Sequence, residues 1–268
     1  MAGKKAAPRA APAMPVLFIG HGSPENALLD NPFTRAMSRL GKELPRPRAI
    51  LCISAHWLTE GTAAAATAAP KTIYDFYGFP PPLYTVKYPA PGSPELAARV
   101  QRLLKPIPAG LDSSWGLDHG TWSVLRHMYP CADVPVVQLS IDFYKPAQHH
   151  YGIGKKLAPL REEGILIIGS GNMVHNLRAL SPGGRDAAPF DWAKQFDAFI
   201  KDSLEKKDHA AIADYQSLGQ VAALAHPTPD HFYPLLYAMG AAGKESGVSY
   251  PYEGYEYGSL SMRAVRFD

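Results

Sequence analysis

The 268-residue chain has only two cysteines, no long apolar run and little excess of charge of one sign. Its two cysteines, Cys52 and Cys131, lie in or beside apolar segments and show no CxxC spacing. This favours two buried thiols in a reducing cytoplasm over a disulfide. No segment approaches the roughly 20 apolar residues needed to span a bilayer, which argues against a membrane protein.

The small positive charge of the chain, +3, comes from its first residues. Residues 1–13 carry Lys4, Lys5 and Arg9, and the rest of the chain balances its acidic and basic residues. We therefore expect no nucleic-acid or membrane-surface patch. Because no apolar core of a signal peptide precedes residue 14, we expect residues 1–13 to be a flexible tail of a cytoplasmic protein.

Several common catalytic and nucleotide-binding motifs are missing as well. The chain has no G-x-G-x-x-G and no Walker A lysine motif, so nucleotide binding is unsupported. It has no G-x-S-x-G nucleophile motif, and the "GSG" at 169–171 lacks the pattern around it. "GSGN" could cradle a phosphate, but alone it is a weak signal.

Apolar runs alternate with helical patterns along residues 14–268, which predicts a single three-layer α/β/α domain with a mostly parallel, mixed sheet. The predicted strands are Val16–Gly20, Ala49–Ser54, Val134–Ser140, Gly164–Gly169 and Ser259–Phe267. Four are continuous apolar runs, as expected where helices cover both faces of a sheet. The last alternates, which suits an edge or antiparallel strand.

Amphipathic patterns and capping residues place the helices. We expect a break at Gly152 or Gly154 in the third helix, and a cap at Thr228 with Pro229 in the first turn of the last. The predicted helices are Pro32–Leu44, Pro94–Leu104, Pro146–Glu163, the segment "PFDWAKQFDAFIKDSLEKKD" and the segment "TPDHFYPLLYAMGAA".

Histidines recur where the predicted strands end. His21 and His56 directly follow strands, and His175 follows a strand on a glycine-rich turn. Ligands bind outside the carboxyl ends of strands in open α/β sheets, and imidazole is the commonest side-chain metal ligand. Any one of these histidines could be a hydrogen-bonded structural residue, but three in the same placement favour a functional cluster. Gly20 and Gly22 would let the backbone turn at the first of them.

The other histidines lie in more varied settings. His119 lies in a glycine-flanked turn before an apolar helix, and His231 in the first turn of the last predicted helix. His226 is more simply a structural turn residue before Pro227. The remaining four are expected to face solvent: His127, His149, His150 and His209.

A long proline-rich segment, "GTAAAATAAPKTIYDFYGFPPPLYTVKYPAPGSP", is rich in tyrosine and phenylalanine. A loop of this length inside a compact domain is more often functional than idle. It could form a wall or lid of an active site, or equally a hydrophobic flap or a subunit contact.

Seven blocks, in order from about residue 15 to the C-terminus, resemble the class III (LigB-type) extradiol ring-cleavage dioxygenases, and most closely their 4,5-DOPA extradiol subfamily. The blocks are "LFIGHGSPENAL", "SAHW", "YPAPGSP", "WGLDHGTWSVL", "VPVVQLSID", "GSGNMVHNLR" and "HPTPDHFYPLLYAMGAA". The resemblance implies cleavage of a catechol ring next to its two hydroxyls with O₂.

The resemblance also implies roles for single residues. His21, His56 and His231 would hold a non-haem metal, His175 would be the catalytic acid/base, and His119 a second pocket histidine. Three neutral imidazoles accept Zn²⁺ as readily as Fe²⁺. Because d¹⁰ zinc cannot share electron density with O₂, we predict Fe(II) for activity, while zinc is a possible bound metal. The candidates for substrate contact are Ser23, Asn26, Trp57 and Tyr74.

Three alternatives remain open from the sequence. A class II metal chelatase also opens with a strand followed by "GHGS", but would not explain "SAHW" or the tyrosine-rich loop. A zinc hydrolase could use the same three histidines, and a non-catalytic relative could keep the fold for binding. The expected partners are a small catechol and O₂, with the protein a monomer or small homo-oligomer.

Overall fold

The computed structural model describes residues 13–268, so all but the last residue of the predicted tail lies outside the described part. An eight-stranded sheet forms the centre, in the order β4-β3-β5-β2-β6-β1-β11-β8. Its middle is parallel: β2 (Ala49–Thr59) lies between β5 (Val136–Asp142) and β6 (Ile165–Gly171), and β6 also pairs with β1 (Val16–Gly20). The predicted mostly parallel, mixed sheet is confirmed.

The remaining strands complete both sides of this parallel centre. On one side β3 (Thr62–Ala65) pairs with β5 in antiparallel fashion and with β4 (Ala109–Asp112) in parallel. On the other side β11 (Ala264–Phe267) runs antiparallel to β1, and β8 (Val248–Tyr252) covers its outer edge.

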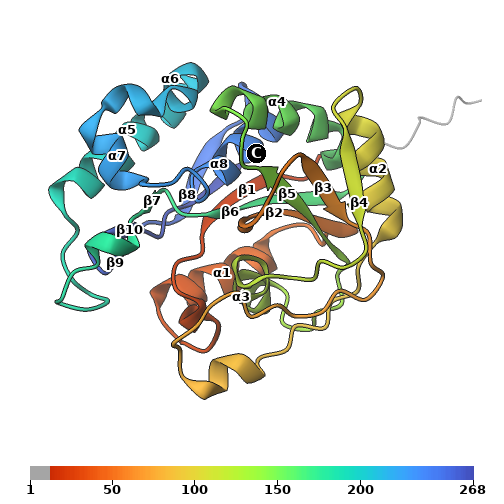
Figure 1. Cartoon of the computed structure of the whole chain (residues 1–268), viewed down its shortest axis with the longest axis horizontal. Helices are drawn as coiled ribbons and strands as arrows, with labels where there is room; N and C mark the ends of the chain where they lie inside the picture. Colours follow the sequence, from red (N-terminus) through yellow and green to blue (C-terminus); the bar gives the residue numbers. More distant parts are fainter. Residues whose placement is uncertain (1–12) are drawn as a thin grey trace, which may run out of the picture.

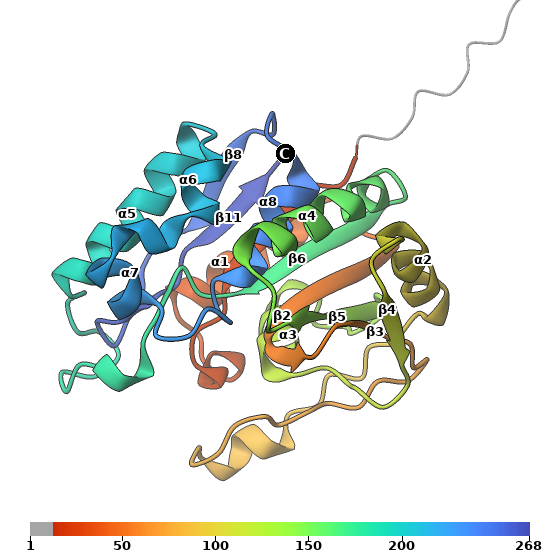
Figure 2. The same ribbon diagram turned by 45° about the horizontal axis from the view of Figure 1, so that its top comes forward.

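Helices cover both faces of the sheet, as Figures 1 and 2 show. One face packs against α1 (Pro32–Glu43) and α3 (His119–Met128). The other face carries α2 (Pro94–Leu104), α4 (Ala147–Leu157) and α8 (Tyr233–Ala242). Beside them lie α5 (Asp191–Glu205), α6 (His209–Ala213) and α7 (Gln220–Ala225).

The central strands are apolar throughout because both of their faces are buried. In β1, Val16 and Phe18 point into the core beneath α4 and α8, whereas Leu17 and Ile19 point into the core beneath α1 and α3. Successive side chains of a strand point to opposite faces, so a strand between two helical layers needs apolar residues at every position. The three-layer prediction is confirmed.

The predicted helix break at Gly152 or Gly154 is wrong. The helix α4 runs unbroken to Leu157 and continues as a 3₁₀ turn, Ala158–Arg161. A Cβ atom at Gly154 would lie 2.3 Å from the carbonyl oxygen of Tyr237. The glycine therefore serves close packing of α4 against α8.

The prediction of one strand over Ser259–Phe267 is also wrong in part. The segment divides into β10 (Leu260–Ser261) and β11, and only β11 joins the main sheet. β10 lies in a three-stranded sheet between β7 (Val174–His175) and β9 (Tyr255–Glu256). The predicted antiparallel pairing is confirmed, but β8 rather than β11 is the edge strand.

The last predicted helix begins later than its proline pattern suggested. α8 starts at Tyr233, not after Thr228, and all ten of its residues are buried. The carbonyl of His231 accepts a hydrogen bond from the backbone N–H of Asn172, which keeps His231 outside the helix. No helix in the part of the chain that the structure describes is long and apolar enough to cross a membrane.

Candidate metal centre

Five histidines line one cavity of about 510 Å³ at the carboxyl ends of the parallel strands. They come from distant parts of the sequence and are His21, His56, His119, His175 and His231. This volume falls in the range of about 300–1,000 Å³ typical of small-molecule pockets. The sequence placed three of these residues at strand ends, and the structure brings all five together.

His21 leaves the end of β1 and is almost fully buried. Gly22 adopts a φ of +61°, a conformation that glycine takes easily, whereas Gly20 is needed for space. A Cβ atom at Gly20 would lie 2.9 Å from backbone atoms of Met262. The two flanking glycines thus have different roles. Gly22 allows the turn, and Gly20 allows the segment around Met262 to approach closely.

The proton on the His21 ring can be placed from its neighbours. Ser170 Oγ donates its only hydrogen to the carbonyl of Gly120, and Nδ1 of His21 lies 3.0 Å from the same Oγ. Nδ1 must therefore carry the proton and donate to Ser170. This leaves Nε2 of His21 with a free lone pair, which faces Nε2 of His56 at 3.0 Å.

His56 lies within β2, not directly after it as the sequence suggested, because the strand continues to Thr59. The pairing of β2 with β5 shifts register between Ile53 and Leu58, and His56 lies in this irregular stretch. Its Nδ1 lies 3.3 Å from Asp75 Oδ2, which favours the proton on that nitrogen. The free Nε2 lone pair of His56 then points at that of His21.

His231 completes the set in the turn before α8. Its Nδ1 hydrogen-bonds the carboxylate of the preceding residue, Asp230. Burial raises the pKa of Asp230, but the hydrogen bond from His231 lowers it strongly, so the carboxylate is ionised and accepts the proton of Nδ1. The other nitrogen of His231 is left for the common centre shared with His21 and His56.

These three rings fit a metal ion. Their ligand nitrogens lie within 4.8 Å of one another. Burial, and then the neighbouring histidines, lower the pKa values of His21 and His56 well below 6.5, which keeps both rings neutral at pH 7. Facing lone pairs on neutral rings repel each other unless a cation lies between them. Ligating histidines typically donate their other N–H to a carboxylate or another acceptor, as all three do here.

Asp75 ties a fourth histidine to the centre. Its carboxylate accepts hydrogen bonds from both the backbone N–H and Nδ1 of His119, each at 2.9 Å, and lies beside His56. Burial raises the pKa of Asp75, but His119 and then His56 lower it to about 2. His119 is the first residue of α3 rather than a turn residue, and Asp118 caps this helix.

His175 lines the same cavity beside His231. Its ring stacks on that of His231, with centroids 3.4 Å apart and planes 4° from parallel. Burial lowers the pKa of His175 well below its ordinary value, and the neighbouring His231 adds to the effect. His175 is therefore neutral at pH 7 and able to accept a proton.

The four candidates for substrate contact do not share one place. Ser23 lines the cavity. Asn26 lies beneath His21, and its amide donates to the His21 carbonyl and to Glu256. Trp57 stacks on another tryptophan, Trp115, and Tyr74 donates its hydroxyl to the carbonyl of Val86. Of the four, the structure thus places only Ser23 on the cavity wall.

Three residues that hold the histidines were not identified from the sequence: Asp75, Asp230 and Ser170. A signal for Asp75 existed, because it is the only acidic residue of the aromatic segment. Asp230 adjoins His231, and Ser170 lies inside the "GSGN" that was considered as a phosphate cradle. The aromatic segment itself supplies Phe76, Tyr77 and Phe79 to the cavity wall.

The histidines outside the cavity only partly match expectation. His150 and His209 are buried, so the prediction that they face solvent is wrong, and His127 and His149 are half-buried. Both ring nitrogens of His150 are satisfied, by the Tyr237 hydroxyl and the Lys145 carbonyl. His226 is buried and bonds the carbonyl of Met173, in line with a structural role.

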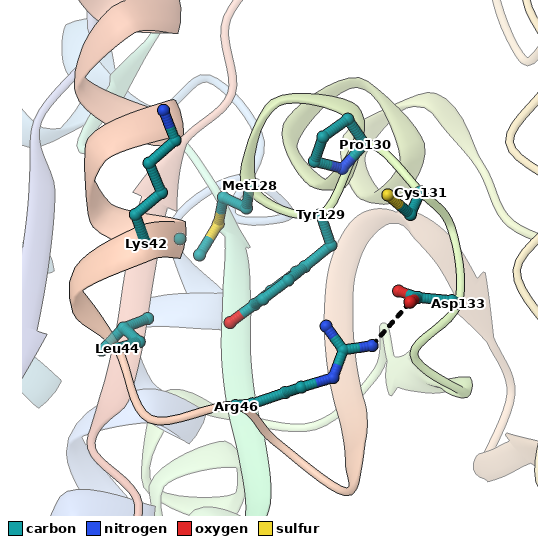
Figure 3. A pocket seen from close by; sticks show the side chains of 9 residues that line it. Lys42, Leu44, Arg46, Met128, Tyr129, Pro130, Cys131 and Asp133 are labelled. Atoms are coloured by element: carbon teal, nitrogen blue, oxygen red, sulfur yellow. Dashed lines mark ion pairs between the residues drawn. The ribbon is translucent and has the colours of Figure 1, made fainter.

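A second cavity, of about 250 Å³, lies at the opposite edge of the sheet. Arg46, before β2, pairs with Asp133, before β5, at 2.7 Å. Figure 3 shows this ion pair. The cavity contains none of the predicted site residues, but it includes Cys131, which is exposed and free. The prediction of two buried thiols is therefore right for Cys52 alone.

Comparison with known proteins identifies the family. The model for the catalytic LigB subunit of aromatic ring-opening dioxygenase matches residues 15–267. The chain belongs to the LigB family. The predicted family membership is thus confirmed. The protein is an extradiol dioxygenase that opens the ring of a catechol with O₂. The chelatase alternative is not favoured.

Curated relatives cover nearly the whole LigB-family chain. A 4,5-DOPA dioxygenase extradiol from Escherichia coli K12 is 50% identical over 258 residues, which cover 94% of each chain. A protein of the same name from Beta vulgaris is 41% identical and covers 93% of this chain and 95% of its own. A crystal structure of an uncharacterized Escherichia coli K12 protein superposes with a TM-score of 0.83 at 46% identity, covering 95% of this chain and all of that one.

Proposed function

We propose that His21, His56 and His231 hold an Fe(II) ion at which this dioxygenase opens a substituted catechol next to its two hydroxyls. The observation that carries the proposal is the tautomer pattern. Each ring has its Nδ1 beside a protein acceptor, Ser170, Asp75 or Asp230, and its Nε2 left for a shared centre. Iron supplies redox chemistry with O₂ when bound, whereas zinc, which suits the same nitrogens, does not.

His175 is our candidate for the general base. It is neutral, lines the cavity and stacks directly on a proposed ligand, His231, so it lies next to where a catechol hydroxyl would be held. Removal of a phenolic proton by a positioned histidine typically contributes about 10²–10⁴ in rate. The proton taken up can later be returned to the opened product.

His119 would hydrogen-bond the oxygen atoms that react through its second ring nitrogen. Asp75 holds its Nδ1 and its backbone N–H, which fixes the ring and leaves Nε2 for the cavity. A ring held in place in this way needs no reorganisation during the reaction.

The names of the relatives suggest which substituent the catechol ring of the substrate carries. Two of them are named 4,5-DOPA dioxygenase extradiol, so L-DOPA is the first substrate to test.

We propose further that residues 14–268 act as one catalytic domain, as a monomer or small homo-oligomer. The two free cysteines support a reducing, cytoplasmic location.

The test is anaerobic reconstitution of the metal-free protein with Fe(II), followed by O₂ and either L-DOPA or 4-methylcatechol. We expect a yellow ring-cleavage product with Fe(II) and none with the matched Zn(II) protein. Equal turnover by the zinc protein would contradict the iron assignment. Failure of the iron protein to open any catechol would contradict the proposed function.

A further inference from the structure

The segment "GSGN", residues 169–172, lies at the end of β6 and contacts two of the proposed metal ligands. The backbone N–H of His21 donates to the carbonyl of Gly171 at 2.9 Å. The backbone N–H of Asn172 donates to the carbonyl of His231 at 3.0 Å. Two histidines from distant parts of the chain are therefore bonded to adjacent residues of one short segment.

The side chains of the GSGN segment add to this arrangement. Ser170 Oγ lies 3.0 Å from Nδ1 of His21. The side-chain amide of Asn172 accepts a hydrogen bond from the backbone N–H of Gly22 at 3.3 Å and donates one to the carbonyl of Ser261 at 2.9 Å. Both side chains are fully buried, so water does not compete for these bonds. The turn after β1 and the strand β10 are thereby fixed to the GSGN segment.

The glycines of this segment leave no space for a phosphate. A glycine-rich anion site keeps backbone N–H groups free for its ligand. Here the N–H of Asn172 is already bonded to His231, and the backbone carbonyls of Pro234 and His231 fill the space beside Gly169 and Gly171. The GSGN segment thus binds other parts of the protein, not an anion.

Gly171 in particular has no room for a side chain. A Cβ atom at this position would lie 2.1 Å from the carbonyl oxygen of His231. That oxygen would have to move by about 0.9 Å before the contact reached 3.0 Å, the closest approach that Cβ atoms tolerate. The strand β6 is held by hydrogen bonds to β1 on one side and to β2 on the other. An added methyl group would therefore displace the turn that carries His231.

We propose that the GSGN segment sets the distance between His21 and His231, and that Gly171 is a positioning residue of the metal centre. This rests on the proposed function, in which both histidines hold the metal. Gly171 does not line the cavity, so it acts through His231. A displacement of about 1 Å in a reacting site can lower turnover by about 10²-fold.

The test measures metal binding as well as turnover, in Gly171→Ala and the unmodified protein. Competition with a chelator gives the affinity for Zn(II) and Co(II), and the visible absorption of bound Co(II) reports the arrangement of its ligands. We expect both metals to bind about 10–100-fold more weakly to Gly171→Ala, as for other changes that misorient a ligand. We also expect a changed Co(II) spectrum once the variant is saturated with metal.

The matched control is Gly41→Ala on α1. A Cβ atom at Gly41 would lie 2.2 Å from the carbonyl oxygen of Met128, beside the second cavity. This substitution therefore creates an overlap of the same kind, but far from the histidines. It should lower the stability of the protein and leave the metal affinity and the Co(II) spectrum unchanged.

A second variant removes contacts without adding atoms, and it serves if Gly171→Ala does not fold. Asn172→Ala keeps the backbone bond to His231 but leaves the N–H of Gly22 and the carbonyl of Ser261 without their partner. Because the turn that carries His21 is then less firmly held, we expect Co(II) to bind about tenfold more weakly and its spectrum to change.

The possible failures can be told apart. Unchanged affinity and spectrum in Gly171→Ala, or in Asn172→Ala if Gly171→Ala does not fold, would overturn the inference while leaving the proposed function intact. An equal loss of affinity in Gly41→Ala would also overturn it, because the effect would then follow from lost stability. Failure of the unmodified protein to bind Zn(II) or Co(II) would overturn the ligand assignment and the inference together.

Discussion

The cavity histidines and His150 are buried in the same molecule but differ in what their second nitrogen meets. His21 has one nitrogen held by Ser170, while the other faces His56 across 3.0 Å. His150 has both nitrogens bonded to protein, to the hydroxyl of Tyr237 at 3.0 Å and to the carbonyl of Lys145 at 3.1 Å. One ring is left with an unsatisfied lone pair, and the other is not.

Burial therefore does not identify a functional histidine in this protein. It is the main cause of the lowered pKa of both His21 and His150, so both are neutral at pH 7. They differ in whether both ring nitrogens have a hydrogen-bond partner. A buried acceptor without a partner costs free energy, and a cation bound between several such acceptors removes that cost. Substitutions at the two sites should consequently damage different properties.

The largest effect is expected at the centre itself. His21→Ala removes one of three proposed ligands, and we expect the purified protein to lose its stoichiometric metal and all measurable ring cleavage. Metal content after reconstitution with Fe(II) or Zn(II) is the measurement. His150→Phe, treated identically, serves as control because it lies outside the cavity. Full iron occupancy in His21→Ala would contradict the ligand assignment.

Removal of the proposed base should be next in size. In His175→Ala we expect kcat to fall by about 10²–10⁴, because the phenolic proton loses its acceptor, while metal content stays near that of the unmodified protein. Turnover and metal content should be measured on the same preparation. Near-normal turnover would contradict the role of His175, and loss of metal would show it to be a ligand.

A smaller loss of metal affinity is expected when a residue that orients a proposed ligand is changed, rather than the ligand itself. Asp230→Asn keeps the shape of the side chain but removes the charge that holds the proton on Nδ1 of His231. Substitution of such a partner typically weakens metal affinity by about 10–100-fold. Competition with a chelator measures the change. Asp202→Asn, an exposed helix position paired with Lys206, is the matched control and should leave affinity unchanged.

The sequence predicted the layers of the fold because they depend on local patterns. The apolar runs at Val16–Gly20 and 165–169 are buried on both faces, and that requirement is visible residue by residue. The start of α8 was not visible, because it depends on a distant hydrogen bond between Asn172 and His231. A long-range contact of that kind leaves no periodic signal near either residue.

The same limit applies to the candidate site. Strand ends placed His21 and His175 at one edge of the sheet, because all parallel strands end there. The support for these rings comes from elsewhere in the chain: Asp75 from the aromatic segment and Ser170 from β6. Sequence reasoning could place the histidines, but tertiary packing decided which acceptor each one met.

The smallest effect on function is expected at His150, and it should appear in stability instead. In His150→Phe the buried hydroxyl of Tyr237 loses its partner, as does the carbonyl of Lys145. A buried polar group left unsatisfied costs about 1–3 kcal/mol, so the free energy of unfolding should fall by that amount at pH 7. Metal content and ring cleavage should remain those of the unmodified protein.

The difference in free energy of unfolding between the unmodified protein and His150→Phe should become smaller at acidic pH. Burial lowers the pKa of His150 from 6.5 to about 4. Between these two pH values, His150 is therefore protonated in the unfolded chain but not in the native protein. The unmodified protein therefore loses stability as pH falls from about 6.5 towards 4, whereas the phenylalanine variant lacks this contribution. At pH 5 the gap between the two should be smaller by about 1–2 kcal/mol in urea unfolding of the metal-free proteins. A gap that stayed constant from pH 7 to pH 5 would mean that His150 is not held neutral, and the contrast with the cavity histidines would lose its physical basis.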